Sequence, residues 1–224
     1  MKTLFHRLAV AVLLLAGLAG HAIAAPHAPA PAAPGTAVHE PAAGRFLVAS
    51  RSLQDPHFAR TVVYLLQHDD KGTLGLVINR TLDITLGEAI PGTELPHLGE
   101  SPLSYGGPVS VRHIIMLLRD DAAPSHAIHI TDGIYASNNM DLLRELDAAN
   151  KPAAELRLFA GHAGWSAGQL QRELDRDDWF IVPGDRSAVF DTTGSRLWER
   201  LIERLDPAGI FVRDRLPAAP RAGL

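Results

Sequence analysis

Two apolar segments joined by a polar turn constrain the fold of this chain more than any other feature. The segments, Thr61–His68 and Leu74–Asn79, are rich in the β-branched and aromatic residues that favour strands. Between them, Asp69–Gly72 (DDKG) has the composition of a tight turn. The sequence therefore predicts an antiparallel hairpin over residues 61–79, and a fold that is built on a sheet.

Apolar periodicity and capping residues indicate further strands and helices along the chain. Strands are predicted at Phe46–Ser50, Leu103–Tyr105, Ile114–Arg119, Ala127–Thr131, Ile134–Tyr135, Leu156–Ala160 and Trp179–Val182, with an edge strand at Val189–Phe190. Helices are predicted between Thr85 and Pro91, over Met140–Ala149 behind Asn138 or Asn139, over Ala167–Leu174, and behind Ser195. The first of these opens with a capping box of Thr85 and Glu88. This mixture favours an α+β domain with a mixed sheet over a regular βαβ repeat.

The stretch Glu155–Trp179 contains a motif with two interpretations. Gly164–Gly168 spells G-x-S-x-G, the nucleophile elbow of α/β-hydrolases. An elbow needs a strand that runs directly into the serine, whereas Ala163 and two glycines separate the predicted strand from Ser166. The triad order of that fold also needs a later histidine, and no histidine follows the serine. Because Ser166 and Gln169 fit a capping box, we interpret the serine as a helix cap after a glycine turn.

The N-terminal residues have the composition of an export signal. Lys2 and Arg7 form a basic start, and the apolar run that follows is shorter than the ~20 residues of a membrane span. The A-x-A motif that ends at Ala24 predicts cleavage before Ala25. We therefore expect a periplasmic or secreted protein with no stable membrane span after cleavage, or a cytosolic one if translation begins nearer Arg45.

Composition divides the remainder of the chain into three parts. Residues 25–44 are dominated by Ala and Pro and predict an extended linker. Residues 45–216 predict a single domain, and residues 217–224 a loose tail. The 224-residue sequence contains no cysteine, which excludes a disulfide framework.

Net charge disfavours a nucleic-acid partner. The formal charge of the whole chain is −4, and loss of residues 1–24 removes two basic and no acidic residues, which leaves −6. A protein with this charge has no general basic footprint for phosphate backbones.

Candidate binding residues are few. His162 and Trp165 flank the predicted glycine turn and are candidate ligand contacts; alternatively, the Trp fills the core while the His satisfies a buried carbonyl. Gly106–Gly107 lacks a phosphate-binding pattern and is more simply explained by a tight backbone crossing. The full set of candidates for a binding surface is Asn79, Gly106, Gly107, Pro108, His162, Trp165 and Gln169. Neither a metal nor a cofactor is expected, because the histidines lack ligand spacing, and no complete catalytic set is found.

Several separated motifs, in order, resemble the AlgH/YqgE family. They are FLVA at 46–49, LQDP at 53–56, TVVYL at 61–65, VINR at 77–80, GGPV at 106–109 and GHAGW at 161–165 before GQL at 168–170. The resemblance covers residues 45–211 and implies a mixed, bifurcated sheet folded as a pseudo-barrel with flanking helices. Family members are usually small cytosolic proteins without an assigned reaction, and some are labelled transcriptional regulators from a link to alginate production. Thr81 stands where the family usually has Pro, and the predicted signal peptide and linker are foreign to its pattern.

Three functions from different classes follow. The first is a non-catalytic binding or accessory protein of the bacterial envelope, with Gly106–Pro108 and His162–Trp165 as its contact surface for an unknown protein or small molecule. The second is the transcriptional regulator of the family label, which export and negative charge disfavour. The third is a serine hydrolase that uses Ser166.

Overall fold

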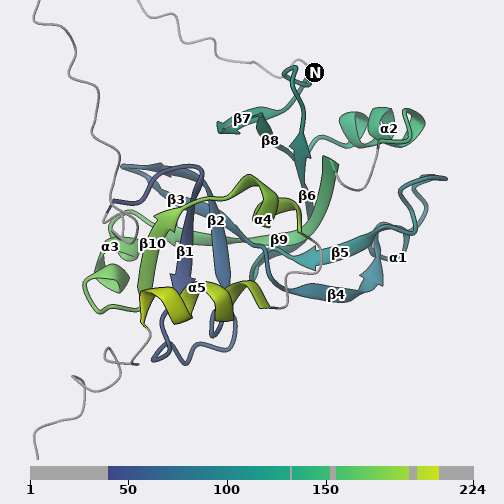
Figure 1. The fold of residues 1–224 in the computed structure, drawn as a ribbon. Coiled ribbons are helices and arrows are strands. Elements are labelled where there is room, and N and C mark those ends of the chain that lie inside the picture. Colours follow the sequence, from purple (N-terminus) through teal and green to yellow (C-terminus); the bar gives the residue numbers. More distant parts are fainter. Residues whose placement is uncertain (1–39, 132, 152–154, 192–195, 207–224) are drawn as a thin grey trace, which may run out of the picture. The chain divides into compact units, whose positions relative to one another are not determined.

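The computed structural model describes residues 40–131, 133–151, 155–191 and 196–206 (Figure 1). The predicted signal peptide, its cleavage site, most of the linker and the tail lie outside these residues. Within them, no helix combines the length and the apolar character that a membrane crossing requires.

The predicted hairpin is confirmed and occupies the centre of the sheet. β2 (Val62–Asp69) and β3 (Gly72–Val77) pair antiparallel, from Val63 opposite Val77 to Asp69 opposite Gly72. In the turn, Asp69 Oδ1 accepts hydrogen bonds from the amides of Lys71 (2.9 Å) and Gly72 (3.1 Å). β1 (Arg45–Ala49) pairs with β2, and β10 (Trp179–Pro183) pairs with β1, both antiparallel as the apolar patterns allow.

The sheet divides at its longest strands. β9 (Leu156–Ser166) pairs with β3 through its second half, and through its first half with β6 (Val109–Arg119) on one side and β5 (Pro102–Tyr105) on the other. The β5–β9 pairing is parallel, whereas the other pairings are antiparallel, so the sheet is mixed. β4 (Thr81–Thr85) extends the β5 branch, and β8 (Ile134–Ser137) and β7 (Ile128–Thr131) extend the β6 branch (Figure 1). The predicted α+β fold with a bifurcated sheet is confirmed, and the sheet curls as a half-barrel.

Two apolar cores lie on opposite faces of β9. Phe159, Ala163 and Trp165 belong to the larger core, which β1, β2, β3 and β10 also build. Leu156, Leu158 and Ala160 belong to the smaller core, with residues of β5, β6 and α2 (Met140–Ala148). Because side chains alternate between the two faces of a strand, β9 contributes residues to both cores.

Three predicted helices are confirmed. α1 (Leu86–Ala89) begins with the Thr85–Glu88 capping box, and α2 begins at Asn139, whose side chain accepts the amides of Asp141 and Leu142. α5 (Leu197–Leu205) packs its apolar face on β1 (Figure 1). Its predicted cap, Ser195, lies outside the described residues.

The predicted edge strand at Val189–Phe190 is wrong. These residues end a helix, α4 (Arg186–Phe190), because Asp185 caps it by accepting the amides of Ser187 and Ala188. Both apolar side chains are buried, so the apolar pair reflects core packing rather than a strand. β4 was not predicted: Leu82 and Ile84 are the only apolar residues of its sequence TLDIT, and neither is buried.

The expected glycine turn at Gly161–Gly164 is also wrong. β9 continues through both glycines to Ser166, because pairing with β3 extends from Ala163 to Ser166. The helix that follows, α3 (Gln169–Leu174), begins two residues later than predicted and has Gly168 at its N-cap. Half of the capping box forms: the Ser166 amide donates to Gln169 Oε1 (3.1 Å), but the serine hydroxyl accepts no amide within the described chain.

Candidate functional site

A close backbone crossing organises the region around Gly106 and Gly107. A Cβ atom at Gly106 would lie 2.1 Å from the Gly161 carbonyl oxygen, and one at Gly107 would lie 2.2 Å from the His162 carbonyl carbon. The Gly106 amide donates to Ala160 (2.9 Å) and its carbonyl accepts from Val77 (2.9 Å). The interpretation of these glycines as a crossing is confirmed, and it leaves Tyr105 and Pro108 on either side of the contact.

A wide bulge follows this crossing. β6 pairs with β9 at Val109 opposite His162 and resumes only at Ile114 opposite Ala160. Four residues of β6, Ser110–His113, therefore face a single residue of β9, Gly161, and all four are exposed. Ser110 has φ of 51°, a left-handed conformation that a residue with a side chain rarely adopts. We call Ser110–His113 the β6 bulge. Bulges and strained residues of this kind are frequent at functional sites.

The β6 bulge borders an open cavity of about 530 Å³, which we call the β4–β6 hollow. A volume of this size lies within the range of ligand pockets. The hollow is lined by His57, Arg80, Thr81, Leu82, Tyr105, Pro108 and Val111. Leu82, Pro108 and Val111 supply apolar walls, and the other four residues have polar side chains.

The polar groups of the hollow are held in place by one another and by a loop. Nδ1 of His57 lies 3.0 Å from the Tyr105 hydroxyl. Arg80 donates through Nη1 to the His57 carbonyl (2.8 Å) and through Nη2 to the Ala59 carbonyl (2.8 Å). Its guanidinium carbon lies 5.9 Å from the centroid of the Tyr105 ring, the geometry of a cation–π contact.

Burial favours the protonated, neutral form of the Tyr105 hydroxyl. Burial raises the pKa of Tyr105 above its ordinary value, an effect that Arg80 opposes and Asp55 reinforces. The hydroxyl is therefore a neutral donor or acceptor at neutral pH. The Asp55 carboxylate is itself engaged, because Oδ1 accepts the amides of His57 (2.8 Å) and Phe58 (3.2 Å).

His162 lies beside the crossing but makes no hydrogen bond through its ring within the described part of the chain. The predicted bond to a buried carbonyl is therefore wrong. Burial lowers the pKa of His162, and the charge of His113 on the β6 bulge lowers it further. His162 thus belongs to the same region as Gly106, Gly107 and Pro108, as the sequence suggested.

Trp165 and Gln169 lie in a different place. Trp165 is only 4% exposed and packs against Phe58 and Trp179, which confirms the interpretation that it fills the core. The indole Nε1 atoms of Trp165 (2.8 Å) and Trp179 (2.9 Å) both donate to Glu173 Oε2. Gln169 Nε2 donates to Glu173 Oε1 (3.1 Å). These side chains therefore hold α3 against β9 and β10.

Asn79 also has a structural role. Its Oδ1 accepts the amide of Val62 (2.8 Å) and its Nδ2 donates to the Arg60 carbonyl (3.0 Å). It thereby fixes the start of β2 and the loop that ends at Arg60. The neighbouring Arg80, and not Asn79, reaches the hollow.

Ser166 differs from a nucleophile elbow in its backbone and its partner. β9 runs directly into Ser166, so the expected gap between strand and serine is wrong. The left-handed residue of this turn is, however, Gly168 (φ 70°) rather than the serine, and the serine hydroxyl lies 3.2 Å from Gln169 Oε1. Among the described residues, no histidine is hydrogen-bonded to it.

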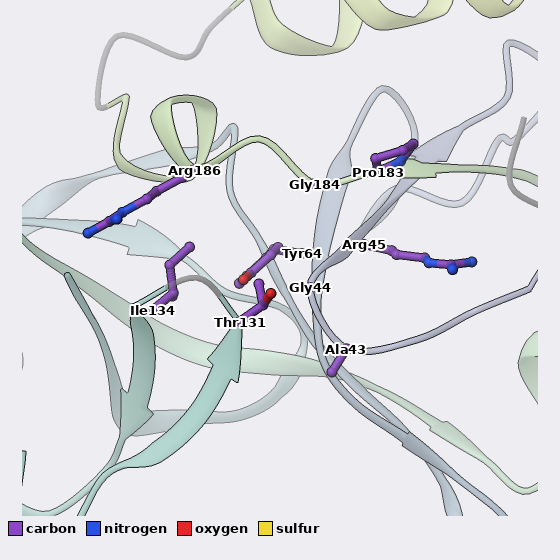
Figure 2. Close-up of a pocket in the computed structure, with 9 residues that line it drawn as sticks. All are labelled: Ala43, Gly44, Arg45, Tyr64, Thr131, Ile134, Pro183, Gly184 and Arg186. Carbon is purple, nitrogen blue, oxygen red and sulfur yellow. The ribbon is translucent and has the colours of Figure 1, made fainter. Parts of the chain in front are cut away.

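A second cavity, of about 250 Å³, lies where the chain enters β1. Figure 2 shows the side chains of Tyr64 and Thr131 directed into it, whereas Arg45 and Arg186 extend away from it in opposite directions. No group of three or more potential metal ligands occurs among the residues that the structure describes.

The sequence did not identify His57 or Tyr105 as site residues. Tyr105 adjoins the recognised Gly106–Gly107 pair, and this adjacency is the one signal that pointed to it. No sequence pattern identified His57 as a site residue, because it lies in a loop 48 positions before Tyr105.

Comparisons with known proteins agree with this architecture. The family model described as AlgH-like matches residues 46–208. A UPF0301 protein of Azoarcus sp. (strain BH72) is 36% identical over 169 residues, covering 74% of this chain and 88% of the relative. A UPF0301 protein of Magnetococcus marinus is 39% identical over 171 residues, covering 74% of this chain and 91% of the relative.

Two solved structures share the fold. The solution structure of the AlgH protein from Pseudomonas aeruginosa has a TM-score of 0.64 and 27% identity, and the match covers 85% of this chain and all (100%) of that one. The crystal structure of a protein from Corynebacterium diphtheriae has a TM-score of 0.63 and 26% identity, covering 77% of this chain and 92% of that one.

Proposed function

The chain belongs to the AlgH-like family, and on that premise we propose that it is a non-catalytic binding protein of the bacterial envelope that holds its partner in the β4–β6 hollow. The observation that carries the proposal is the hollow itself. Apolar walls and a few positioned polar groups are the usual composition of a binding site.

The β6 bulge supports this assignment. A left-handed Ser110 and four residues without a cross-strand partner cost stability, and such features persist where a function requires them. The glycine crossing directly beneath the bulge holds it at the rim of the hollow. Export is supported by the composition of residues 1–24.

Site-specific photo-crosslinking in the producing cell tests the binding role. A benzophenone amino acid at position 111, in the hollow, is compared with one at position 128 on β7. Val111 and Ile128 are matched, because both are aliphatic strand residues, 53% and 54% exposed. We expect an adduct at position 111 only, and the adduct's mass distinguishes a protein from a small molecule. No adduct at position 111, or equal adducts at both positions, would contradict the proposal.

Fractionation with intact mass measurement tests export. We expect a periplasmic species that begins at Ala25, and a longer species when Ala24→Asp blocks the A-x-A site. A cytosolic species that begins near Gly44 would contradict export while leaving the binding site untouched.

A fluorophosphonate probe tests the non-catalytic part of the proposal. We expect no labelling of the wild-type protein, because Ser166 has a glutamine rather than a histidine as its hydrogen-bond partner. Labelling of the wild-type protein that is lost in Ser166→Ala would support the serine-hydrolase hypothesis and contradict a non-catalytic role.

A further inference from the structure

We infer that the partner in the β4–β6 hollow is an extended polypeptide segment that presents a carboxylate beside an apolar side chain. The inference rests on the proposed function and names the class of partner. Three independent features of the hollow support it: unpaired backbone, an exposed apolar side chain, and a positive charge that has no ion-pair partner among the described residues.

The backbone around the hollow has free edges. Ser110–His113 have no cross-strand partner in the described part of the chain. β4 pairs with β5 along one edge only, and only at Thr81 and Thr85. Unpaired strand segments of this kind bind extended peptides through main-chain hydrogen bonds. A small molecule would leave these groups unused.

Exposed apolar side chains gather on the same two strands. Four large apolar residues are exposed in the described chain, and three of them, Ile84, Val109 and Val111, belong to β4 and β6. Val111 lines the hollow together with Leu82 and Pro108. An apolar side chain of the partner would cover Val111 and the apolar wall beside it, since exposed apolar surface commonly marks an interaction site.

Charge complementarity accounts for the carboxylate that we infer on the partner. Arg80 is the one permanently charged residue that lines the hollow, and no ion pair of Arg80 is found among the described residues. Its guanidinium is held by backbone carbonyls, so its position is set before a partner arrives. The Asp55 carboxylate, whose charge also acts on Tyr105, accepts two backbone amides and forms no ion pair with Arg80. A carboxylate of the partner would compensate the charge of Arg80 and accept a hydrogen bond from Tyr105.

A second copy of this chain fits less well. Antiparallel pairing of two β4 strands about their central residue would place Asp83 opposite its own copy. Like charges directly opposite one another destabilise a strand pair. The hollow therefore favours a different polypeptide.

Selection from a display library of random dodecapeptides tests the inference on the purified mature protein. We expect enriched peptides that share an acidic residue next to an apolar one. Replacing that acid by its amide should weaken binding about tenfold, the effect of one charge-assisted hydrogen bond, and added salt should weaken it further. Val111→Asp should weaken binding at least about tenfold, whereas Ile128→Asp should leave it within about twofold.

Circular dichroism and thermal melting confirm that both variants are folded. Absence of enrichment, enriched peptides without a shared acid, or equal binding by Val111→Asp would overturn the inference. If library selection fails but position 111 crosslinks to a species of small-molecule mass, the partner class is wrong and the binding role stands. If neither selection nor crosslinking succeeds, the proposed function fails as well.

Discussion

Arg157 shows how one side chain joins elements that are distant in the sequence. It is 4% exposed, and its guanidinium donates to the carbonyls of Ile78 (3.1 Å) and Val189 (2.7 Å) and to Ser104 Oγ (2.8 Å). Burial lowers its pKa to about 10, which Asp191 partly opposes, so the group is still charged at neutral pH. Buried polar groups in such a network are costly to remove, because their partners are left unsatisfied.

We therefore expect Arg157→Met to lower the free energy of unfolding by about 2 to 3 kcal/mol, because the carbonyls of Ile78 and Val189 lose their donor. Arg144→Met is the matched control, since Arg144 is exposed and pairs with Asp141 on the surface of α2. Its effect should stay within about 0.5 kcal/mol. Urea denaturation measures both. Equal losses in the two variants would show that Arg157 has no special structural role.

The ring of His162 predicts a pH dependence. Its lowered pKa means that the folded protein favours the neutral ring, whereas the unfolded chain takes up the proton at the ordinary value. Stability is therefore lost as the pH falls through the unfolded pKa, about 6.5, towards the lowered one. Above that window the ring is neutral in both states and contributes nothing to the slope.

We expect His162→Gln to flatten the fall in unfolding free energy between about pH 7.5 and 5.5. His113→Gln should flatten it partly, because the charge of His113 is the second cause of the lowered pKa. Denaturant titrations across this pH range measure the slope. A slope that is unchanged in His162→Gln would disprove the assignment.

At the scale of elements, the crossing of Gly106–Gly107 over Gly161–His162 determines where β5, β6 and β9 meet. Neither glycine of the first pair tolerates a Cβ atom, because the atoms it would meet are backbone atoms that cannot move independently. The crossing thus positions Tyr105 and Pro108 at the hollow. A substitution at the crossing should therefore lower the stability of the fold and alter the geometry of the hollow.

We expect Gly106→Ala to destabilise the protein by about 2 kcal/mol or more, because its Cβ would force two strands apart. Gly164→Ala, in the β9 strand that Gly106 crosses, is the matched control, since its Cβ would meet no atom closer than 3.7 Å. Thermal unfolding compares the variants. The idea of a tight crossing would be wrong if both alanines were tolerated equally.

At the scale of the whole molecule, charge decides which partners are accessible. Loss of residues 1–24 leaves a formal charge of −6, which repels a phosphate backbone. We expect no saturable binding when the mature protein is titrated with duplex DNA at low salt. Saturable binding with a steep salt dependence would instead support the regulator label of the family.

The local elements could be predicted from short stretches of sequence. The β2–β3 hairpin, the Thr85–Glu88 capping box and a cap at Asn138 or Asn139 were all predicted, because each depends on residues only a few positions apart; the structure selects Asn139. One error arose where long-range pairing overrode a local signal, and another where a local capping signal was missed. Glycines that suggested a turn lie inside β9, because β3 pairs with its second half, and Val189–Phe190 is helical because Asp185 caps α4.

The composition of the candidate site, in contrast, became visible only in the folded chain. The candidate binding surface predicted from the sequence contained Gly106–Pro108 and His162, which lie near the hollow. It also contained Trp165 and Gln169, which instead form hydrogen bonds with Glu173. The hollow depends on His57, Arg80 and Tyr105, which come from a loop and two different strand ends. Such a site forms through contacts between distant segments, and no local pattern records which segments will meet.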